Sequence, residues 1–167
     1  MKPAYCWTPL LKQDLDEVNR IADDIHTSLP ERPEVFAEKV ELSPATCMKL
    51  TDGARMLGYG ISHPWSLFNI PPLDDFLGKL PEAPDCVYLH DIVIRPEARG
   101  SQAAAGYVRL LEESARTNSI RALALVSVYG TDILWSRLGF KVKSTPELNR
   151  KLSSYGPSAK YMIRQLQ

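Results

Sequence analysis

Residues 86–128 hold a strand, a helix and a second strand in succession, and this order restricts the chain to few folds. The run 86–94 is short, largely apolar and rich in β-branched residues, and Pro96 ends it because proline has no N–H for a neighbouring strand. From about residue 102, apolar residues recur at the spacing of one helix face. The run 121–128 is almost continuously apolar, as in a strand buried on both faces. The segment predicts a parallel strand–helix–strand crossover at the centre of an α/β protein.

The turn between the first strand and the helix has the chemistry of an anion site. Amides in the first turn of a helix lack intrahelical partners, and the helix dipole is positive there. Gly100 and Ser101 are small, and Arg95 and Arg99 add positive charge beside them. An ordinary strand-to-helix turn with surface arginines explains the same residues equally well. The residues alone leave both interpretations open.

The same turn resembles the acetyl-CoA-binding motif of the GCN5-related N-acetyltransferase (GNAT) superfamily. That motif follows the fourth strand and reads Arg/Gln-x-x-Gly-x-Gly/Ala, where this chain has Arg99-Gly100-Ser101-Gln102-Ala103-Ala104. Gln102 stands where the family has its first required glycine. Residues 123–140 resemble the family's fifth strand and the helix that ends in Tyr-x-x-x-Gly-Phe, with Trp135 in place of that tyrosine.

The resemblance extends over roughly residues 5–166 and implies the GNAT fold. This is an α/β (α+β) arrangement with a mixed central sheet of about six or seven strands and about four helices. We expect residues 1–167 to form one such domain, a length close to the common domain size. Patterning and turn residues place the other elements. Further strands are expected at 4–9, 46–50, 56–62, 140–144 and 159–165, and further helices at 12–27, 34–40 and 131–138, with a polar loop before the last strand.

For the cosubstrate, the resemblance implies acetyl-CoA, with no metal. In the family the fourth and fifth strands diverge, and the pantetheine arm hydrogen-bonds to the open edge of the fourth. Here that edge is the main chain of Ile92, Val93 and Ile94, where an N–H would polarise the thioester carbonyl. The pyrophosphate would lie on the amides of Arg99, Gly100, Ser101, Gln102, Ala103 and Ala104.

His90 is the predicted general base. The run Tyr88-Leu89-His90-Asp91 resembles the Tyr-Leu-Glu-Asp run of polyamine acetyltransferases, and His90 lies nine residues before Arg99, as their catalytic glutamate lies before the motif arginine. An unperturbed imidazole titrates near pH ~6.5 and can accept a proton at neutral pH. A structural histidine, or a Glu or Asp acting through water, is the alternative. Regular alternation would place Asp91 on the opposite face from His90, which disfavours Asp91.

Tyr129, at the end of the fifth strand, is the predicted acid for the leaving thiolate, with Ser127 or a water as alternatives. Trp135 cannot do this because indole has no useful pKa, so core packing is its expected role. His26 lies at the end of the first helix, where a histidine usually meets solvent or the helix dipole.

The acceptor is expected to be a primary amine of a small molecule or a peptide. A cationic acceptor would need acidic groups near the cleft, for which Glu31, Glu34, Asp74 and Asp75 are candidates. The irregular segment 63–85 forms either one wall of the acceptor pocket or a cover over the sheet. The alternative to an enzyme is a catalytically weak or inactive CoA-binding or interaction module on the same fold, which Gln102 and Trp135 favour.

Charge and cysteine usage bear on partners and location. The chain has 20 basic and 20 acidic residues, so it lacks the basic excess of a non-specific nucleic-acid or membrane-surface binder. Cys6, Cys47 and Cys86 are scattered and do not match zinc-site spacing. The N-terminus shows no secretory pattern, so we expect a cytoplasmic protein with reduced thiols. The resemblance is compatible with a homodimer.

Overall fold

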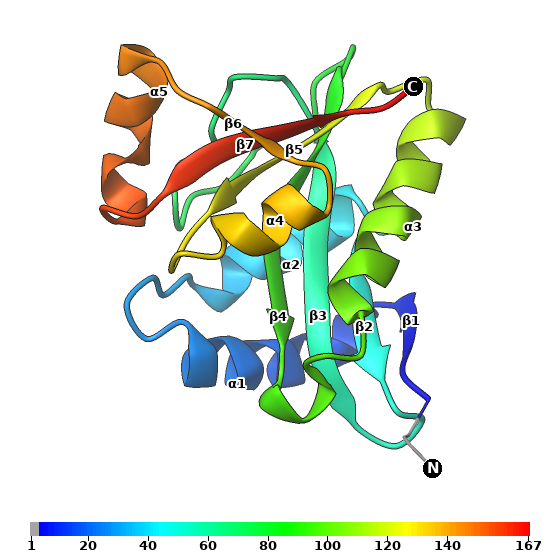
Figure 1. Ribbon diagram of the computed structural model, residues 1–167. Coiled ribbons are helices and arrows are strands. Elements are labelled where there is room, and N and C mark those ends of the chain that lie inside the picture. The colour runs from blue at the N-terminus through cyan, green and yellow to red at the C-terminus, as the bar shows by residue number, and fades with distance from the viewer. Residues whose placement is uncertain (1–3) are drawn as a thin grey trace.

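The computed structural model describes residues 4–167, and these build one mixed seven-stranded sheet (Figure 1). The strand order is β1-β2-β3-β4-β5-β7-β6, and among the described strands β4 and β5 alone pair in parallel. The strands are β1 (Cys6–Pro9), β2 (Met48–Thr51), β3 (Met56–Trp65), β4 (Cys86–Ile94), β5 (Ala122–Ser127), β6 (Lys141–Lys143) and β7 (Lys160–Gln165). This arrangement confirms the expected fold class. Residues 1–3 of the expected domain lie outside the described residues.

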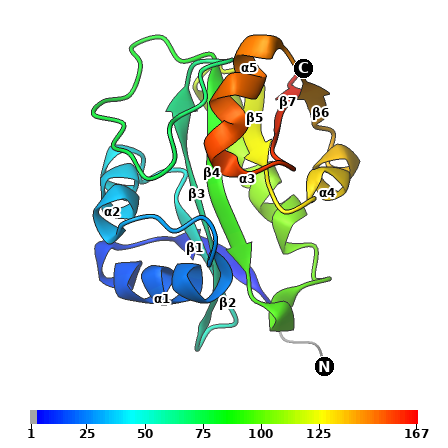
Figure 2. The same cartoon turned by 90° about the vertical axis from the view of Figure 1, so that its left-hand side faces the viewer.

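Helices cover both faces of the sheet (Figure 2). They are α1 (Leu15–Ile25), α2 (Pro33–Leu42), α3 (Ala103–Thr117), α4 (Asp132–Arg137) and α5 (Pro146–Lys151). The apolar stripe of α3, with Tyr107 and Leu111, packs with Trp135 of α4 on one face. Val18 of α1 and Phe36 of α2 pack on the opposite face. Helices therefore cover both faces of the sheet around β5, as the apolar run of this strand predicts.

One extra residue interrupts the regular pairing of β4. Asp91 pairs with Ile61 of β3 and Leu89 pairs with the next residue, Ser62, so His90 forms a β-bulge. A bulge reverses the alternation of side chains beyond it. Leu89 and Ile92 both pack toward α3, whereas Asp91 reaches His26 on the α1 side. The expectation that Asp91 lies on the opposite face from His90 is therefore wrong, because the strand is not regular there.

The parallel strands β4 and β5 separate soon after they meet. Their pairing runs from Val87 with Leu123 to Leu89 with Leu125. Beyond that point β5 continues to pair with β7, as far as Ser127 with Lys160. From His90 onward, the side of β4 that faces β5 has no strand partner among residues 4–167. The sheet therefore opens near its centre, next to the bulge.

Several sequence-based boundaries need correction. The stretch read as a polar loop before the last strand contains α5, where the Leu148 N–H donates to the capping Thr145 Oγ1 over 3.1 Å. The helix expected at 12–27 is a 3₁₀ turn at Lys12–Asp14 followed by α1. Strand β3 continues three residues beyond Ser62 to Trp65. No helix within residues 4–167 is both long enough and apolar enough to cross a membrane.

Candidate active site

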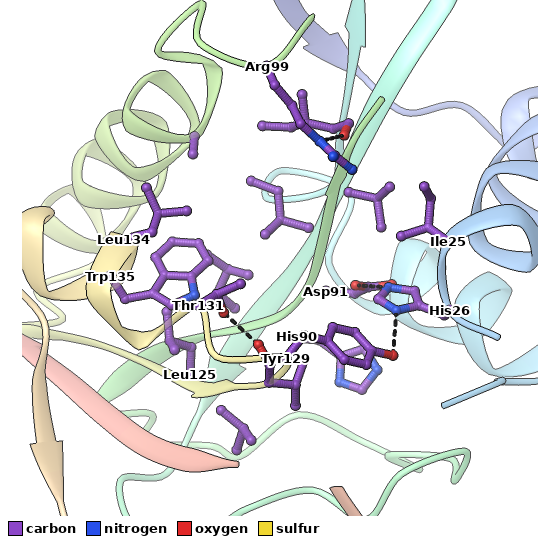
Figure 3. Close-up of a pocket in the computed structure, with 17 residues that line it drawn as sticks. Ile25, His26, His90, Asp91, Arg99, Leu125, Tyr129, Thr131, Leu134 and Trp135 are labelled. Atoms are coloured by element: carbon purple, nitrogen blue, oxygen red, sulfur yellow. Dashed lines mark hydrogen bonds and ion pairs between the residues drawn. The ribbon is translucent and has the colours of Figure 1, made fainter. Parts of the chain in front are cut away.

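A cavity of about 430 Å³ occupies the opening between β4 and β5 (Figure 3). Its walls come from the end of α1, the free edge of β4, the start of α3, and the segment from β5 into α4. Apolar side chains such as Leu125, Leu134 and Trp135 line one side. The polar groups His26, His90, Asp91 and Tyr129 gather at the bulge. An apolar cavity with a few convergent polar groups is the usual form of a ligand site.

The predicted cofactor residues divide between this cavity and the turn before α3. Ile92, Val93, Ile94, Arg99 and Ala104 line the cavity. The lining does not include the turn residues, which are Gly100, Ser101, Gln102 and Ala103. The Arg99 guanidinium folds back and donates from Nε to the Ile94 carbonyl over 3.2 Å. This contact joins the turn to the end of β4.

Gln102 has a left-handed backbone conformation, which glycine adopts without strain. It is the N-cap of α3, with φ 63° and ψ 26°, and Gly100 two residues earlier has φ 77°. A non-glycine residue in this left-handed region is strained by roughly 1–2 kcal/mol. A Cβ added at Gly100 would meet no atom within 4 Å, so the space beside the turn is open. Gln102 therefore replaces the motif's glycine at a position whose backbone a glycine would adopt without strain.

His90 is buried and paired with a carboxylate. Its Nε2 lies 2.9 Å from Oε1 of Glu31, which belongs to the connection between α1 and α2. The two side chains are 1% and 6% exposed. Nδ1 of His90 has no hydrogen-bond partner among the described residues. Because carboxylates accept only, the Nε2 that faces Glu31 carries a proton, and in the neutral imidazole Nδ1 is then the nitrogen with a free lone pair.

A second histidine–carboxylate pair lies beside the first. His26 Nε2 is 2.8 Å from Asp91 Oδ1, and the Tyr59 hydroxyl donates to Asp91 Oδ2 over 2.6 Å. The other nitrogen of His26, Nδ1, lies 3.3 Å from the Tyr129 hydroxyl. Figure 3 shows His26 and Tyr129 meeting across the cavity. Tyr59, Asp91, His26 and Tyr129 thus form one chain of hydrogen bonds, in that order.

The electrostatics of this second pair favour a charged imidazole. Burial alone would lower the pKa of His26, but the hydrogen bond to Asp91 and the negative charges of Asp91 and Glu31 together raise it above its ordinary value. Burial, followed by the nearby Asp91 carboxylate, raises the pKa of Tyr59, which therefore stays protonated and donates. When His26 is protonated, its Nδ1 carries a hydrogen and can donate it to the Tyr129 oxygen 3.3 Å away.

Tyr129 and Trp135 occupy different environments. Tyr129 is 48% exposed and has φ 56°, a strained backbone that is often found at functional turns. Trp135 is 5% exposed and packs edge-on against Phe140, with ring centroids 5.7 Å apart, as the core interpretation expects. Ser127 is buried, and its Oγ lies 3.2 Å from Thr131 Oγ1. Tyr129 is therefore the more accessible of the two hydroxyls considered as acids.

A smaller recess of about 40 Å³ adjoins the bulge on the side away from α3. It shares His26, His90 and Asp91 with the larger cavity and adds Glu31. Its further walls are Leu29, Leu73 and Tyr155, together with Val126 and Val128, which also line the larger cavity. Leu73 belongs to the irregular segment 63–85, so this segment does form part of a wall. The other acidic candidates, Glu34, Asp74 and Asp75, do not line the recess.

Sequence reasoning underrated His26 and Glu31. His26 was interpreted as a helix-end residue, and Glu31 as one of several acidic residues near the cleft. Their partners lie 65 and 59 positions away, so local spacing carries no signal for either pair. The adjacent His90 and Asp91 are the one visible hint, since a bulge would turn both toward the α1–α2 connection. Among residues 4–167, no group of three or more His, Cys, Asp or Glu side chains could hold a metal ion.

Comparison with known proteins identifies the family of the chain. Residues 15–140 match the acetyltransferase (GNAT) family, and the chain belongs to that family. Membership of this family supports an acyl-CoA-dependent N-acyltransferase activity. A comparison with curated proteins gives no match.

Solved structures share the fold at low identity. Ard1 from Thermoplasma volcanium is similar with a TM-score of 0.74 and 13% identity, over 98% of this chain and 99% of that chain. The ribosomal-protein-S18-alanine N-acetyltransferase from Escherichia coli has a TM-score of 0.67 and 15% identity, over 98% and 95%. The GNAT-like decarboxylase GphF in complex with isobutyryl-CoA has a TM-score of 0.75 and 13% identity, over 97% and 100%. At these identities the likeness concerns the fold alone.

Proposed function

We propose that the protein transfers an acetyl group from acetyl-CoA to a primary amine by direct attack. The observation that carries the proposal is the cavity between β4 and β5, which has a free strand edge, two histidine–carboxylate pairs and a tyrosine hydroxyl around it. The pantetheine arm would pair with the main chain at Ile92–Ile94. The pyrophosphate would lie on the amides from Arg99 to Ala104, at the positive end of α3.

In this proposal His90 is the general base. The amine nitrogen attacks the thioester carbonyl carbon, the C–N bond forms and the C–S bond breaks. The proton leaving the amine goes to Nδ1 of His90, the nitrogen without a partner in the described structure. The Glu31 carboxylate on Nε2 holds the tautomer and stabilises the imidazolium that forms. A main-chain N–H of β4 stabilises the oxyanion.

Tyr129 supplies the proton to the CoA thiolate. Its hydroxyl hydrogen goes to sulfur, and His26 replaces it through Nδ1, 3.3 Å away. Asp91 is a positioning residue that holds His26 through Nε2, and Tyr59 holds Asp91 in turn. A thiolate is a modest base, so protonation by Tyr129 speeds turnover and is not required for it. Acetyl transfer therefore does not depend on a tyrosine at position 135, where this chain has Trp135.

Calorimetric titration of acetyl-CoA into the protein tests the first requirement. Gly100→Glu places an anion in the open space beside the turn, so the wild type should bind and this variant should not. Gly100→Ala is the matched control, because it carries the same strain at φ 77° without the charge. Failure of the wild type to bind would contradict the proposal and favour the interaction module.

Location and organisation are part of the same proposal. We propose one catalytic domain over residues 1–167, supported by the single sheet that spans the described residues. A cytoplasmic location is supported by Cys6, Cys47 and Cys86, which are free thiols in the described structure. A homodimer, which the family resemblance allows, would be tested by sedimentation of the purified protein.

A further inference from the structure

We infer that the acceptor is a small primary amine on an unbranched apolar chain without a carboxylate, and that this chain lies in the recess between Leu29, Leu73 and Tyr155. The inference rests on the proposed function and concerns the same site. It follows from three features of the recess: its size, the way its outer wall is fastened, and its charge.

The recess is narrow. Its volume of about 40 Å³ holds about three to four water-sized groups, since one such group needs roughly 10–15 Å³. His90, the proposed base, lines it, and its apolar walls are Leu29, Leu73, Val126 and Val128. An amine on a branched carbon, such as the N-terminus of most peptides, presents two substituents at that point. A straight chain presents one, which fits.

The outer wall of the recess is the segment that contains Leu73, and this segment is hydrogen-bonded to the α1–α2 connection and to α2. The Arg32 main-chain N–H donates to Asp74 Oδ1 over 2.7 Å, and Arg32 Nη2 donates to the Asp74 carbonyl over 2.8 Å. Glu38 accepts from the N–H groups of Leu77 and Gly78 over 2.6 and 3.0 Å. These contacts hold the segment that carries Leu73 against the mouth of the cleft, so the narrow recess is a built feature.

Glu31 connects this wall to the base. The same carboxylate that contacts His90 Nε2 accepts from the Asp74 main-chain N–H over 3.2 Å. On the opposite wall, the Tyr155 hydroxyl donates to the Pro71 carbonyl. The position of Leu73 is therefore fixed by hydrogen bonds on both sides of it in the sequence.

The charge of the recess disfavours an acidic acceptor. Its titratable groups are Glu31, Asp91, two histidines and Tyr155, and no Lys or Arg is among the residues that line it. The nearest cations are occupied elsewhere: Arg32 contacts Asp74, and buried Lys39 donates from Nζ to the Asp75 carbonyl over 3.3 Å. When protonated, His26 already pairs with Asp91, so a carboxylate on the acceptor would add a third negative charge to the recess, whereas an ammonium group would be attracted before it loses its proton.

The test compares acceptors with acetyl-CoA as donor and follows thiol release. Butylamine is compared with 4-aminobutanoate, in which a carboxylate ends the chain, and with trialanine amide, whose amine is on a branched carbon. We expect kcat/KM for butylamine to exceed the other two by at least about tenfold. Equal or faster turnover of 4-aminobutanoate or of the peptide would overturn the inference while leaving the proposed acetyltransferase intact. Binding of acetyl-CoA without thiol release for any acceptor would instead overturn the proposed function, and the inference with it.

A pair of variants tests the wall itself. Leu73→Ala should raise kcat/KM for sec-butylamine relative to butylamine by about fivefold or more, because a branched carbon then fits. Leu80→Ala is the matched control, since Leu80 lies in the same segment and does not line the recess. An unchanged ratio in Leu73→Ala, with thermal unfolding like that of the control, would show that Leu73 does not bound the acceptor.

Discussion

His90 and Glu31 lie in contact although they come from the centre of a strand and from a helix connection 59 residues earlier. The pair is buried, and its geometry leaves one histidine nitrogen without a partner in the described structure. A buried imidazole of this kind has a defined tautomer and one basic nitrogen. In the proposed function this nitrogen, Nδ1, is the general base.

Replacement of His90 should strongly reduce turnover and leave the binding of acetyl-CoA unchanged. We expect His90→Ala to lower kcat for acetyl transfer by about 10²–10⁴-fold, because a positioned base contributes about that much. Calorimetry should give a Kd for acetyl-CoA within about twofold of the wild type. His63→Gln is the control, since His63 is a buried histidine whose ring lies 6.4 Å from that of His90 but which does not line the cavity. Retained activity in His90→Ala would show that the base is elsewhere.

The pair of His26 and Tyr129 should behave as one unit. We expect Tyr129→Phe and His26→Gln each to lower kcat by about tenfold or more, with little change in KM for acetyl-CoA. The double variant should be no slower than the slower single variant, because residues in one hydrogen-bonded chain are not additive. Steady-state kinetics of the three variants give this coupling. Fully additive losses would mean that the 3.3 Å contact has no part in the reaction.

Much of the framework could be predicted from sequence because its signals are local. Strand β4 was expected at 86–94 and occupies Cys86–Ile94, since its apolar run is bounded by a proline. Helix α3 was placed within one residue at its start for a similar reason. Helix α5 was missed although Thr145 and Pro146 are good helix-start residues, because the polar residues after them read as loop.

The paired histidines could not be predicted because their contacts are tertiary. Residue alternation placed Asp91 away from the site, and the bulge at His90 reversed it. No residue type marks a bulge in a strand that is otherwise apolar. Likewise, His26 reaches Asp91 only because α1 lies across that face of the sheet, a fact that no spacing in the sequence expresses.

Acid should destabilise the protein through His63. Burial, followed by repulsion from His90 and Lys39, lowers the pKa of His63 from 6.5 to about 3, and its neighbours also include Tyr88 and Trp65. Below pH ~6.5 the unfolded chain takes up a proton that the folded protein does not, so stability falls as pH falls from about 6.5 toward 3.

Urea unfolding at two pH values measures this effect. Between pH 7.5 and 5, the wild type should lose about 2 kcal/mol more of its unfolding free energy than His63→Gln, which cannot titrate. Above pH ~7, the difference in unfolding free energy between the wild type and His63→Gln should no longer change with pH. A pH-independent offset over the whole range would show that His63 is protonated in the folded protein as readily as in the unfolded chain.

Glycine at position 102 should stabilise the fold. Gln102 has φ 63°, where glycine is free of strain, so Gln102→Gly should raise the unfolding free energy by about 1 kcal/mol. Gly100→Ala, which introduces strain at φ 77°, should lower it by a similar amount. Thermal unfolding of both variants checks the opposite signs. Calorimetry should show acetyl-CoA binding to Gln102→Gly at least as tight as to the wild type.

The opening in the sheet also bears on self-association. A strand edge with unpaired N–H and C=O groups is ordinarily a template for aggregation. Here the unpaired part of β4 lines the cavity, and the segment from β5 into α4 forms the wall opposite it. The outer edges of the sheet are β1 and β6, so this unpaired stretch lies at the centre of the sheet. The hydrogen-bonding groups that the proposed function assigns to the pantetheine arm are therefore set inside the molecule and not along the outer edge of its sheet.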